Sequence, residues 1–251
     1  GGSTFTQECF FPWFWSNGAR MFDDDLNLVL NSPEAVEVLK FYVSLKPFAP
    51  PGVTTYEWGE EQEAFYAEKV AMTQYMGRVL RKVEAYAPQL HPVTKVVRIP
   101  HGKGKETITF NVADVWGIPA KADYPDVAKE FIKFILTGDR YVRWIHGATP
   151  QTIPALISTS QSQAYLNHKV IQLHPEEYKI LADACLKDKG WIPTAEGGVL
   201  NPKGQEVRNS RIIVRMVQEA WIQGVPPEQA VANAEKAFIE LVGGRKVEKL
   251  K

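Results

Sequence analysis

The chain has 251 residues, of which 45% are hydrophobic and 23% charged, and these are the proportions of a globular protein with enough apolar material for a core. Lys plus Arg equals Asp plus Glu, at 29 each, so the formal net charge is zero. That balance argues against a dedicated nucleic-acid binder, which carries a basic excess. No apolar run in the sequence approaches the length of a membrane span.

The first residues are Gly-Gly-Ser-Thr, without an initiator Met or a charged-then-apolar leader. We therefore expect that a targeting segment was removed or that the chain is a fragment. An aromatic run follows at 10–15, and its Pro12 is best tolerated in the first turn of a helix. Because consecutive helical side chains point about 100° apart, one face cannot hold all three rings that come next. We expect Trp13, Phe14 and Trp15 to lie mostly in the core.

Several segments carry the signals of amphipathic helices. The clearest begins where Ser32 can serve as N-cap and Pro33 as the first helical residue, with apolar residues recurring at helical spacing. Pro and Gly clusters follow it and end the helix. The expected helices span 31–45, 59–69, 78–86, 124–136, 209–221 and 226–242. The side chains expected to be buried on them are Val36, Leu39, Val43, Val127, Phe131, Phe134, Ile135, Ile213, Met216, Val217, Ala220, Trp221, Val231, Ala234, Phe238 and Leu241.

Fewer segments indicate strands. Residues 70–75 resemble a short buried strand, and alternating runs at 93–99 and 106–118 are joined by a stretch typical of a hairpin loop. The Gly- and Pro-rich stretch 191–205 is expected to be a loop. A few short strands among many helices predict an α/β fold.

The residues needed for a metal site or for catalysis do not converge in the sequence. The five histidines are scattered, and Cys9 and Cys185 lack C-x-x-C spacing, so we expect no metal and no cofactor. The two thiols are expected to be buried, with a long-range disulfide as the alternative. Asp23, Asp24 and Asp25 resemble a polar surface turn, although adjacent carboxylates can also bind a hard cation or act in acid–base catalysis.

Five stretches, in order, resemble the C-terminal half of ABC-transporter extracellular solute-binding proteins of the carbohydrate-binding group, the maltose-binding and glycerol-3-phosphate-binding type. They are NGARMFDDDLNLVLNSPEAVEVLKFYVSL (17–45), EAFYAEKVAMT (63–73), VWGIPAKADYPDVAKEFIKFIL (115–136), HGATPQTIPAL (146–156) and RIIVRMVQEAWIQGVPPEQAVANAEKAFIEL (211–241). One departure is that Ala67 and Glu68 stand where the family commonly has a Gly. The order and spacing of the stretches, rather than any one motif, carry the resemblance.

The resemblance implies a periplasmic-binding-protein-like fold of two α/β lobes joined by crossing strands, with ligand in the cleft. Residues 1–106 would belong to part of the second lobe, 107–150 mainly to the first lobe, and 151–251 mainly to the second lobe. Family chains are markedly longer, so an N-terminal remainder of the same protein is an expected partner. Without it, the chain should carry unpaired strand edges and an uncovered apolar face.

The resemblance also implies the function. The chain would be the solute receptor of an ABC importer, extracytoplasmic and not an enzyme, which closes on a sugar by hinge motion and delivers it to the permease subunits. One alternative is an anionic ligand, such as a glycerol phosphate or an acidic sugar. An alternative of another class is a carbohydrate-active enzyme that uses the carboxylates at 23–25 or those of Glu60 and Glu61.

Two groups of expected ligand contacts come from the ends of elements. In the family, the N-terminal end of the aromatic helix edges the cleft, which places Glu8 and Phe11 nearest the ligand. A carboxylate accepts hydrogen bonds from sugar hydroxyls, and a ring stacks on the apolar face of a pyranose. Tyr75, Gly77 and Arg78 follow the expected strand at 70–75, where α/β folds place ligands.

A further group lies on the expected crossing strand, which carries Asn111, Asp114 and Trp116, with the last two on one face. Arg211 opens the penultimate helix, at a position that resembles the arginine with which the glycerol-phosphate type binds its anion. A surface or salt-bridged arginine is the alternative for both Arg211 and Arg78.

Overall fold

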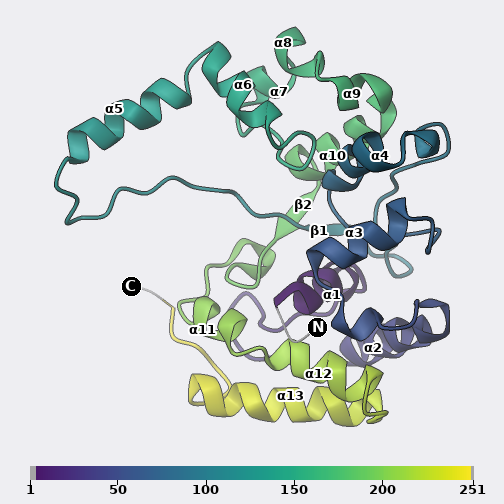
Figure 1. Ribbon diagram of the computed structural model, residues 1–251. Coiled ribbons are helices and arrows are strands. Elements are labelled where there is room, and N and C mark those ends of the chain that lie inside the picture. Colours follow the sequence, from purple (N-terminus) through teal and green to yellow (C-terminus); the bar gives the residue numbers. More distant parts are fainter. Residues whose placement is uncertain (1–3, 250–251) are drawn as a thin grey trace. The chain divides into compact units, whose positions relative to one another are not determined.

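The computed structural model describes residues 4–249, which are mostly helical (Figure 1). Contacts divide the chain into two compact units. The first holds the residues up to Gln74, Arg98–Asn111 and those from Asp188 onward, and the second holds Tyr75–Val97 and Val112–Lys187. Both units are discontinuous in sequence, whereas the expected lobe division ran as 1–106, 107–150 and 151–251. The assignment of these segments to the lobes of a complete receptor stays a prediction.

The first unit contains helices α1 (Thr4–Ser16), α2 (Pro33–Ser44), α3 (Trp58–Tyr66), α11 (Gly204–Asn209), α12 (Ile212–Trp221) and α13 (Pro227–Val242), and strands β1 (Ile108–Phe110) and β2 (Lys189–Trp191). Its core is built around α1, which contacts β1, α2 and α12, while α12 and α13 lie side by side (Figure 1). The expected helices at 31–45, 209–221 and 226–242 are confirmed within a few residues. The inward faces of α12 and α13 are buried, as Ile213 and Phe238 show.

Helix α1 differs from the prediction, because it begins eight residues before Pro12 rather than at it. A proline inside a helix costs about 3 kcal/mol. Burial of Phe10 and Phe11, at about 1.5–3 kcal/mol for each side chain, offsets that cost. Phe14 and Trp15 are also buried, as expected, whereas Trp13 is only half-buried.

The expected strands at 70–75 and 93–99 are wrong, and within 106–118 only β1 forms a strand. The expected hairpin is absent from the described residues. Instead β1 pairs in parallel with β2, with Thr109 opposite Gly190. The alternating residues at 93–99 are not buried on one face, since Val97 is 81% exposed. A strand needs a partner edge and a buried face, and these segments have neither in the described structure.

The second unit contains helices α4 (Arg78–Tyr86), α5 (Pro125–Ile135), α6 (Asp139–His146), α7 (Ile157–Ser160), α8 (Gln163–Leu166), α9 (Lys169–Leu173) and α10 (Pro175–Leu186). Its core is small and centres on Tyr141, Ile145, Tyr165, Ile171 and Tyr178. Among residues 4–249, no helix has the length and apolar content to cross a bilayer.

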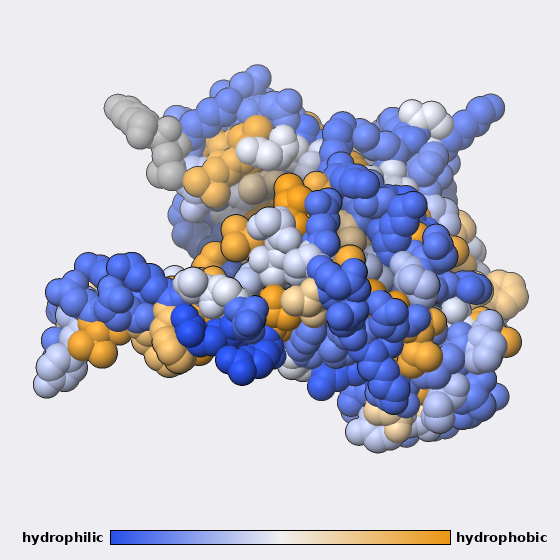
Figure 2. Space-filling view, turned by 90° about the horizontal axis from the view of Figure 1, so that it is seen from above, coloured by the Kyte–Doolittle hydropathy of each residue, from blue (hydrophilic) through white to orange (hydrophobic). Residues whose placement is uncertain are grey.

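Helix α5 begins and ends within one residue of the predicted bounds, but its apolar face is exposed rather than buried. Phe131 is 54% exposed, and Val127 and Phe134 lie beside it on the surface. A long extended segment precedes the helix, and α5 contacts α6 (Figure 1). Figure 2 shows hydrophobic residues, in orange, on the surface of this helix. Within the second unit the face is covered only in part, by Trp116 against Phe131, and the exposed remainder agrees with the expectation of an uncovered apolar surface.

Candidate ligand-binding site

The N-terminal half of α1 presents a charged pair that only the fold brings together. The Oε1 atom of Glu8 lies 3.0 Å from Nη2 of Arg208 on α11, and both side chains are partly exposed, at 22% and 35%. Gln7, which is buried, donates from Nε2 to the Arg208 carbonyl at 3.3 Å. The pair offers both a carboxylate that accepts hydrogen bonds and a guanidinium that donates them, so it can bind vicinal hydroxyls.

Arg208 was missed by the sequence analysis. The available signal was its spacing, since it stands three residues before Arg211, which was singled out. Arg211 is the N-cap residue of α12 and is exposed, with a left-handed backbone at φ 57°. Such a conformation is uncommon for a residue other than glycine and concentrates at functional positions. Arg208 and Arg211 therefore lie on one short segment of the first unit, at the end of α11 and the start of α12.

Phe11 occupies the core, which makes the expectation of a ring that faces the ligand wrong for this structure. Its side chain is 1% exposed and stacks on Trp15 with ring centroids 4.7 Å apart. Phe110 of β1 stacks on the same pair of rings. Trp13, expected in the core, is half-buried and donates from Nε1 to the Gln74 side chain at 2.5 Å. The two rings thus have the opposite exposures to those expected.

Asn111 follows β1 directly and extends its pairing, since its backbone N–H donates to the Trp191 carbonyl at 3.2 Å. Its side chain lies over Gly190, where an added Cβ would come within 2.4 Å of Asn111 Cβ. Glycine is therefore required at position 190 by the close approach of the two chains. Asn111 and the Glu8–Arg208 pair belong to the same unit.

Tyr75, Gly77 and Arg78 lie in the second unit, in the loop before α4 and at its start, rather than after a strand. An added Cβ on Gly77 would lie 2.2 Å from the Pro150 carbonyl oxygen, so a packing constraint is enough to explain this glycine. Arg78 donates from Nε to the Gln151 side chain. Tyr75 is half-buried. The local contacts of Gly77 and Arg78 hold the loop at 147–152 against α4.

Asp114 and Trp116 lie in the extended segment before α5, which is not a strand. Trp116 packs on Phe131 of α5 and Trp144 of α6, with ring centroids 6.0 and 5.6 Å apart. Asp114 is exposed. Trp116 is therefore part of an aromatic cluster on α5 and α6 in this structure, and it remains partly exposed.

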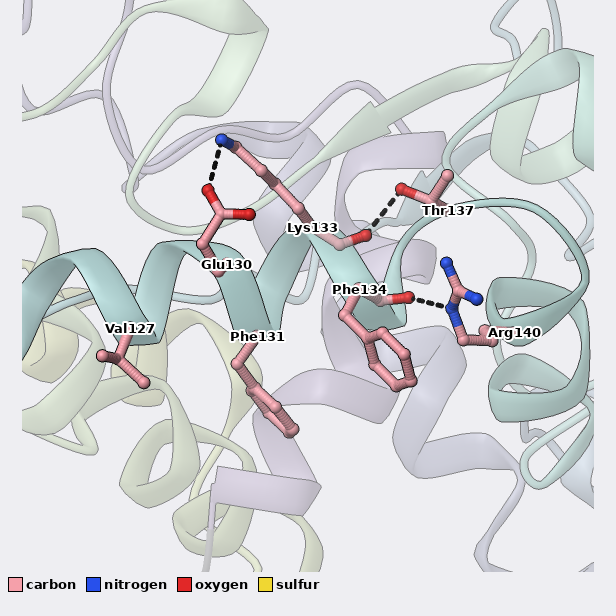
Figure 3. Close-up of a pocket in the computed structure, with 7 residues that line it drawn as sticks. All are labelled: Val127, Glu130, Phe131, Lys133, Phe134, Thr137 and Arg140. Carbon is pink, nitrogen blue, oxygen red and sulfur yellow. Dashed lines mark hydrogen bonds and ion pairs between the residues drawn. The ribbon is translucent and has the colours of Figure 1, made fainter.

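A hollow lies along α5, between its apolar face and the start of α6 (Figure 3). It is lined by Val127, Glu130, Phe131, Lys133, Phe134, Thr137 and Arg140. The polar groups are engaged locally: Glu130 pairs with Lys133 at 2.7 Å, and Arg140 donates to the Phe134 carbonyl at 2.6 Å. Hydrogen-bonding groups convergent on a ligand are absent from this described surface. The hollow has the character of a packing face rather than a ligand site.

Three of the carboxylates considered for catalysis or metal binding, those of Asp23, Asp24 and Glu60, have local structural roles. Asp23 accepts from the backbone N–H groups of Asp25 and Asn27, as in a polar turn, and Asp24 pairs with Arg20 at 2.7 Å. Glu60 accepts from the Glu57 N–H in the capping box of α3. Burial raises the pKa of Glu61 to about 8. No group of three potential metal ligands occurs within residues 4–249.

The two cysteines are not alike. Cys9 is half-buried in the first unit, where burial, and then the neighbouring Glu61 and Glu8 carboxylates, raise its thiol pKa. Cys185 is exposed in the second unit, so the expectation that both thiols are buried is wrong for Cys185.

Comparison with known proteins identifies the class. The sequence pattern of the bacterial extracellular solute-binding protein family matches residues 6–138, more than half of the chain. The chain therefore belongs to the bacterial extracellular solute-binding protein family. Among curated protein sequences, none matches the chain significantly.

Solved structures similar to this chain include proteins with a bound sugar. Maltose-bound MalE3 of T. maritima is 21% identical and superposes with a TM-score of 0.72, over 94% of this chain and 57% of that one. A solute-binding protein of Thermotoga lettingae bound with α-D-tagatose is 16% identical, with a TM-score of 0.69 over 96% of this chain and 57% of that one. A substrate-binding protein of Listeria monocytogenes in complex with cycloalternan has the same identity and TM-score, over 96% and 58%.

These likenesses define the fold as the two-lobed periplasmic-binding-protein type, of which this chain represents a part. The chain spans less than three-fifths of the length of the solved structures it matches. The predicted fold class and family resemblance are thereby confirmed.

Proposed function

We propose that the chain is the ligand-binding and permease-facing part of a sugar receptor for an ABC importer, and that it binds a neutral sugar or oligosaccharide without turning it over. The observation that carries the ligand class is the Glu8–Arg208 pair. Because the carboxylate lies 3.0 Å from the guanidinium, the net charge of the pair itself is close to zero. Such a pair suits hydroxyl groups better than an anion, which would have to compete with Glu8 for the arginine.

Family membership supports an extracellular or periplasmic location and permease subunits as partners. Relatives bound to α-D-tagatose, maltose and cycloalternan support a carbohydrate ligand for this chain. In this proposal Tyr75, Arg78, Asn111, Asp114, Trp116 and Arg211 remain candidate contacts, while Phe11 and Gly77 serve the architecture around them.

The proposal includes a partner for the apolar face of α5, namely the N-terminal remainder of the same receptor. Two observations support it. The face is exposed over Val127, Phe131 and Phe134, and the chain spans about 57% of the solved structures it resembles. Because these side chains are about half exposed, burial of the face in a complete receptor would stabilise it by about 1–1.5 kcal/mol for each of them.

A thermal-shift screen of the complete receptor against neutral sugars and sugar phosphates tests the ligand class. We expect neutral sugars to raise the melting temperature and Glu8→Gln to reduce affinity by about ten- to a hundred-fold, the effect of one lost charge-assisted contact. Glu235 is the matched control, because it also pairs with an arginine, Arg245, at 2.9 Å, on α13. Stabilisation by sugar phosphates alone, or equal effects of Glu8→Gln and Glu235→Gln, would refute the proposal.

Catalysis is tested separately. Oligosaccharides that stabilise the protein should be recovered unchanged after long incubation, because the carboxylates of Asp23, Asp24 and Glu60 are engaged in local contacts and do not face each other across a cleft as a glycosidase requires. Steady product release that Asp24→Asn or Glu61→Gln abolishes would instead establish the carbohydrate-active enzyme.

A further inference from the structure

Four of the five histidines lie in the second unit as two ring-contact pairs, one at each end of α9. His168 is the N-cap residue of α9 and His174 is its C-cap residue. The His146 and His168 ring centroids are 4.9 Å apart, and those of His91 and His174 are 4.8 Å apart. The histidines were scattered in the sequence, so the arrangement exists only in the fold.

The pair at the C-terminal end is joined nitrogen to nitrogen. His91 Nδ1 lies 2.6 Å from His174 Nε2, so one of the two nitrogens must be without a proton. The His174 side chain is almost fully buried. Full protonation of both rings would place two N–H groups against each other and two positive charges in contact, which would break this bond.

The charged groups around this pair act in opposite directions. Glu177 of α10 lies 3.8 Å from His174 Nδ1 and favours a proton there. Lys95, however, pairs with Glu177 at 3.0 Å and offsets its charge. The pKa of His174 is lowered by burial first and then by His91, against the effect of Glu177.

The pair at the N-terminal end controls the helix cap. His168 Nδ1 accepts the Val170 N–H at 3.3 Å, and this requires that Nδ1 carry no proton. His146 Nε2 lies 3.0 Å from the Tyr165 carbonyl and donates to it. From α4, Arg81 disfavours and Glu84 favours a charge on His168. Burial, then His146 and Arg81, lower the His168 pKa despite Glu84.

We propose that the two histidine pairs form an acid-sensitive latch, which holds α9 closed at neutral pH and releases it as the pairs take up protons. In the closed state the His168 and His174 rings stay neutral at the contacts that fix α9. In an open state these two rings would titrate near the free value of about 6.5. The open state then binds more protons below that pH, so acidification favours opening.

Helix α9 also carries an ion pair, between Lys169 and Glu84, but this pair does not explain an acid response near pH 6. Lys169 bonds to the Glu84 carboxylate, and this bond lowers the Glu84 pKa below its ordinary value of 4.5. The carboxylate therefore stays ionised at pH 5, and the pair persists while the histidines titrate. Opening would expose Val170 and Ile171, the two buried residues of α9.

Hydrogen exchange of the 251-residue chain between pH 7.5 and 5.0, corrected for the intrinsic exchange rate, measures the opening of α9. Each histidine that is free to titrate only in the open state should raise the opening constant by up to about tenfold per pH unit below 6.5, or about a hundredfold for two. Amides of α12 and α13 in the first unit should show no such increase.

His168→Asn keeps a side-chain acceptor at the N-cap but cannot titrate, and His91→Gln keeps a partner for His174. The double variant should show a weaker pH dependence of α9 opening, about tenfold rather than a hundredfold per pH unit, because His174 can still titrate. His101→Gln, which changes an exposed histidine of the first unit, should retain the full dependence. An unchanged pH dependence in the double variant overturns the proposal. So does NMR titration of the unaltered chain in which the His168 and His174 rings titrate at or above 6.5 while α9 stays protected, a readout that does not depend on any variant folding.

Discussion

Trp15 donates from Nε1 to the Oε1 atom of Glu196 at 2.6 Å, which links the aromatic helix to a loop that lies 181 residues further along the chain. The same buried carboxylate accepts the backbone N–H groups of Met21 and Phe22, each at 2.9 Å. One side chain thus satisfies donors from α1 and from the segment after it. Glu196 therefore organises this part of the first unit.

Replacement of Glu196 should destabilise the chain. Glu196→Ala leaves three buried donors without an acceptor, and each unsatisfied group costs about 1–3 kcal/mol. We therefore expect the free energy of unfolding to fall by at least about 3 kcal/mol. Glu196→Gln keeps one acceptor oxygen and should cost less. Urea denaturation followed by tryptophan fluorescence measures both, and a loss below about 1 kcal/mol for Glu196→Ala would contradict this role.

The difference in unfolding free energy between the unaltered chain and Glu196→Gln should depend on pH, and the direction of the change can be predicted. Burial raises the pKa of Glu196 to about 7 from an ordinary value of 4.5, against the opposing effect of its hydrogen bonds and Arg20. Between these values the folded chain holds a proton that the unfolded chain has lost, so this group's contribution to stability falls as pH rises. The stability of the unaltered chain minus that of Glu196→Gln should therefore decrease from pH 4.5 to 7. The subtraction removes the histidine contribution, which has the opposite sign.

A second prediction concerns Glu68, which has a left-handed backbone at φ 58° and, with Ala67, stands where the resemblance implies a glycine. The conformation costs a residue with a Cβ about 1–2 kcal/mol, while glycine loses about 0.5–1 kcal/mol of chain entropy. We expect Glu68→Gly to stabilise the chain by about 0.5–1 kcal/mol. Ala67→Gly, at a position with φ −87°, should instead destabilise it, and thermal melts of the two variants would show opposite shifts.

A further pair of variants tests a glycine that packs tightly against another part of the backbone. Gly77→Ala would place a Cβ 2.2 Å from the Pro150 carbonyl oxygen, a backbone atom that cannot easily move. We expect a loss of about 1–3 kcal/mol. Gly59→Ala is the control, because nothing lies within 4 Å of its added Cβ and a helical alanine is favoured there. If both variants melt alike, the close approach to Pro150 is not a real constraint.

The exposed face of α5 gives a prediction for the 251-residue chain by itself. Phe131→Ser should reduce binding of a hydrophobic dye and self-association, with little loss of stability, because the ring is half exposed already. Lys129→Ser, on the same helix but polar in the unaltered chain, should change neither. In a complete receptor Phe131→Ser should be destabilising, because the face would then be covered. Equal dye binding by the three proteins would contradict the assignment.

Local signals account for what could be predicted from the sequence. Ser32 and Pro33 start α2, and Ser32 Oγ does accept the Ala35 N–H at 3.2 Å, because caps and helical periodicity depend on neighbours along the chain. The failures were contacts between distant residues. The partner of β1 lies about 80 residues away, and Arg208 lies 200 residues from Glu8.

The prediction of which aromatic rings are buried failed for a related reason. Composition and spacing cannot decide which ring of a dense run faces inward when the helix continues through a proline. Phe11 was expected at the ligand and lies in the core, since Trp15 and Phe110 supply a stacking surface that only the fold assembles. A buried position for Phe11 follows from those partners, and its own neighbours in the sequence contain no equivalent signal.

The charge of the ligand can be decided at Arg211. If the ligand is a neutral sugar, Arg211→Ala should weaken binding by less than Glu8→Gln, and added salt should have little effect, because no net charge is neutralised on binding. An anionic ligand would instead form a charge-assisted contact with Arg211. Such a contact contributes roughly 1.5–3 kcal/mol, so its loss would weaken binding by about ten- to a hundred-fold and would remove much of the salt dependence.

Titration calorimetry of the complete receptor at low and high salt, with Arg211→Ala and Glu8→Gln, supplies the ratio of losses that separates the two ligand classes. Arg215→Ala is the matched control, since Arg215 is exposed on α12 one turn after Arg211. A neutral ligand predicts a larger loss for Glu8→Gln at both salt concentrations. If neither Glu8→Gln nor Arg211→Ala differs from Arg215→Ala, the ligand does not contact this end of α1 and α12, and the candidate site must be placed elsewhere on the chain.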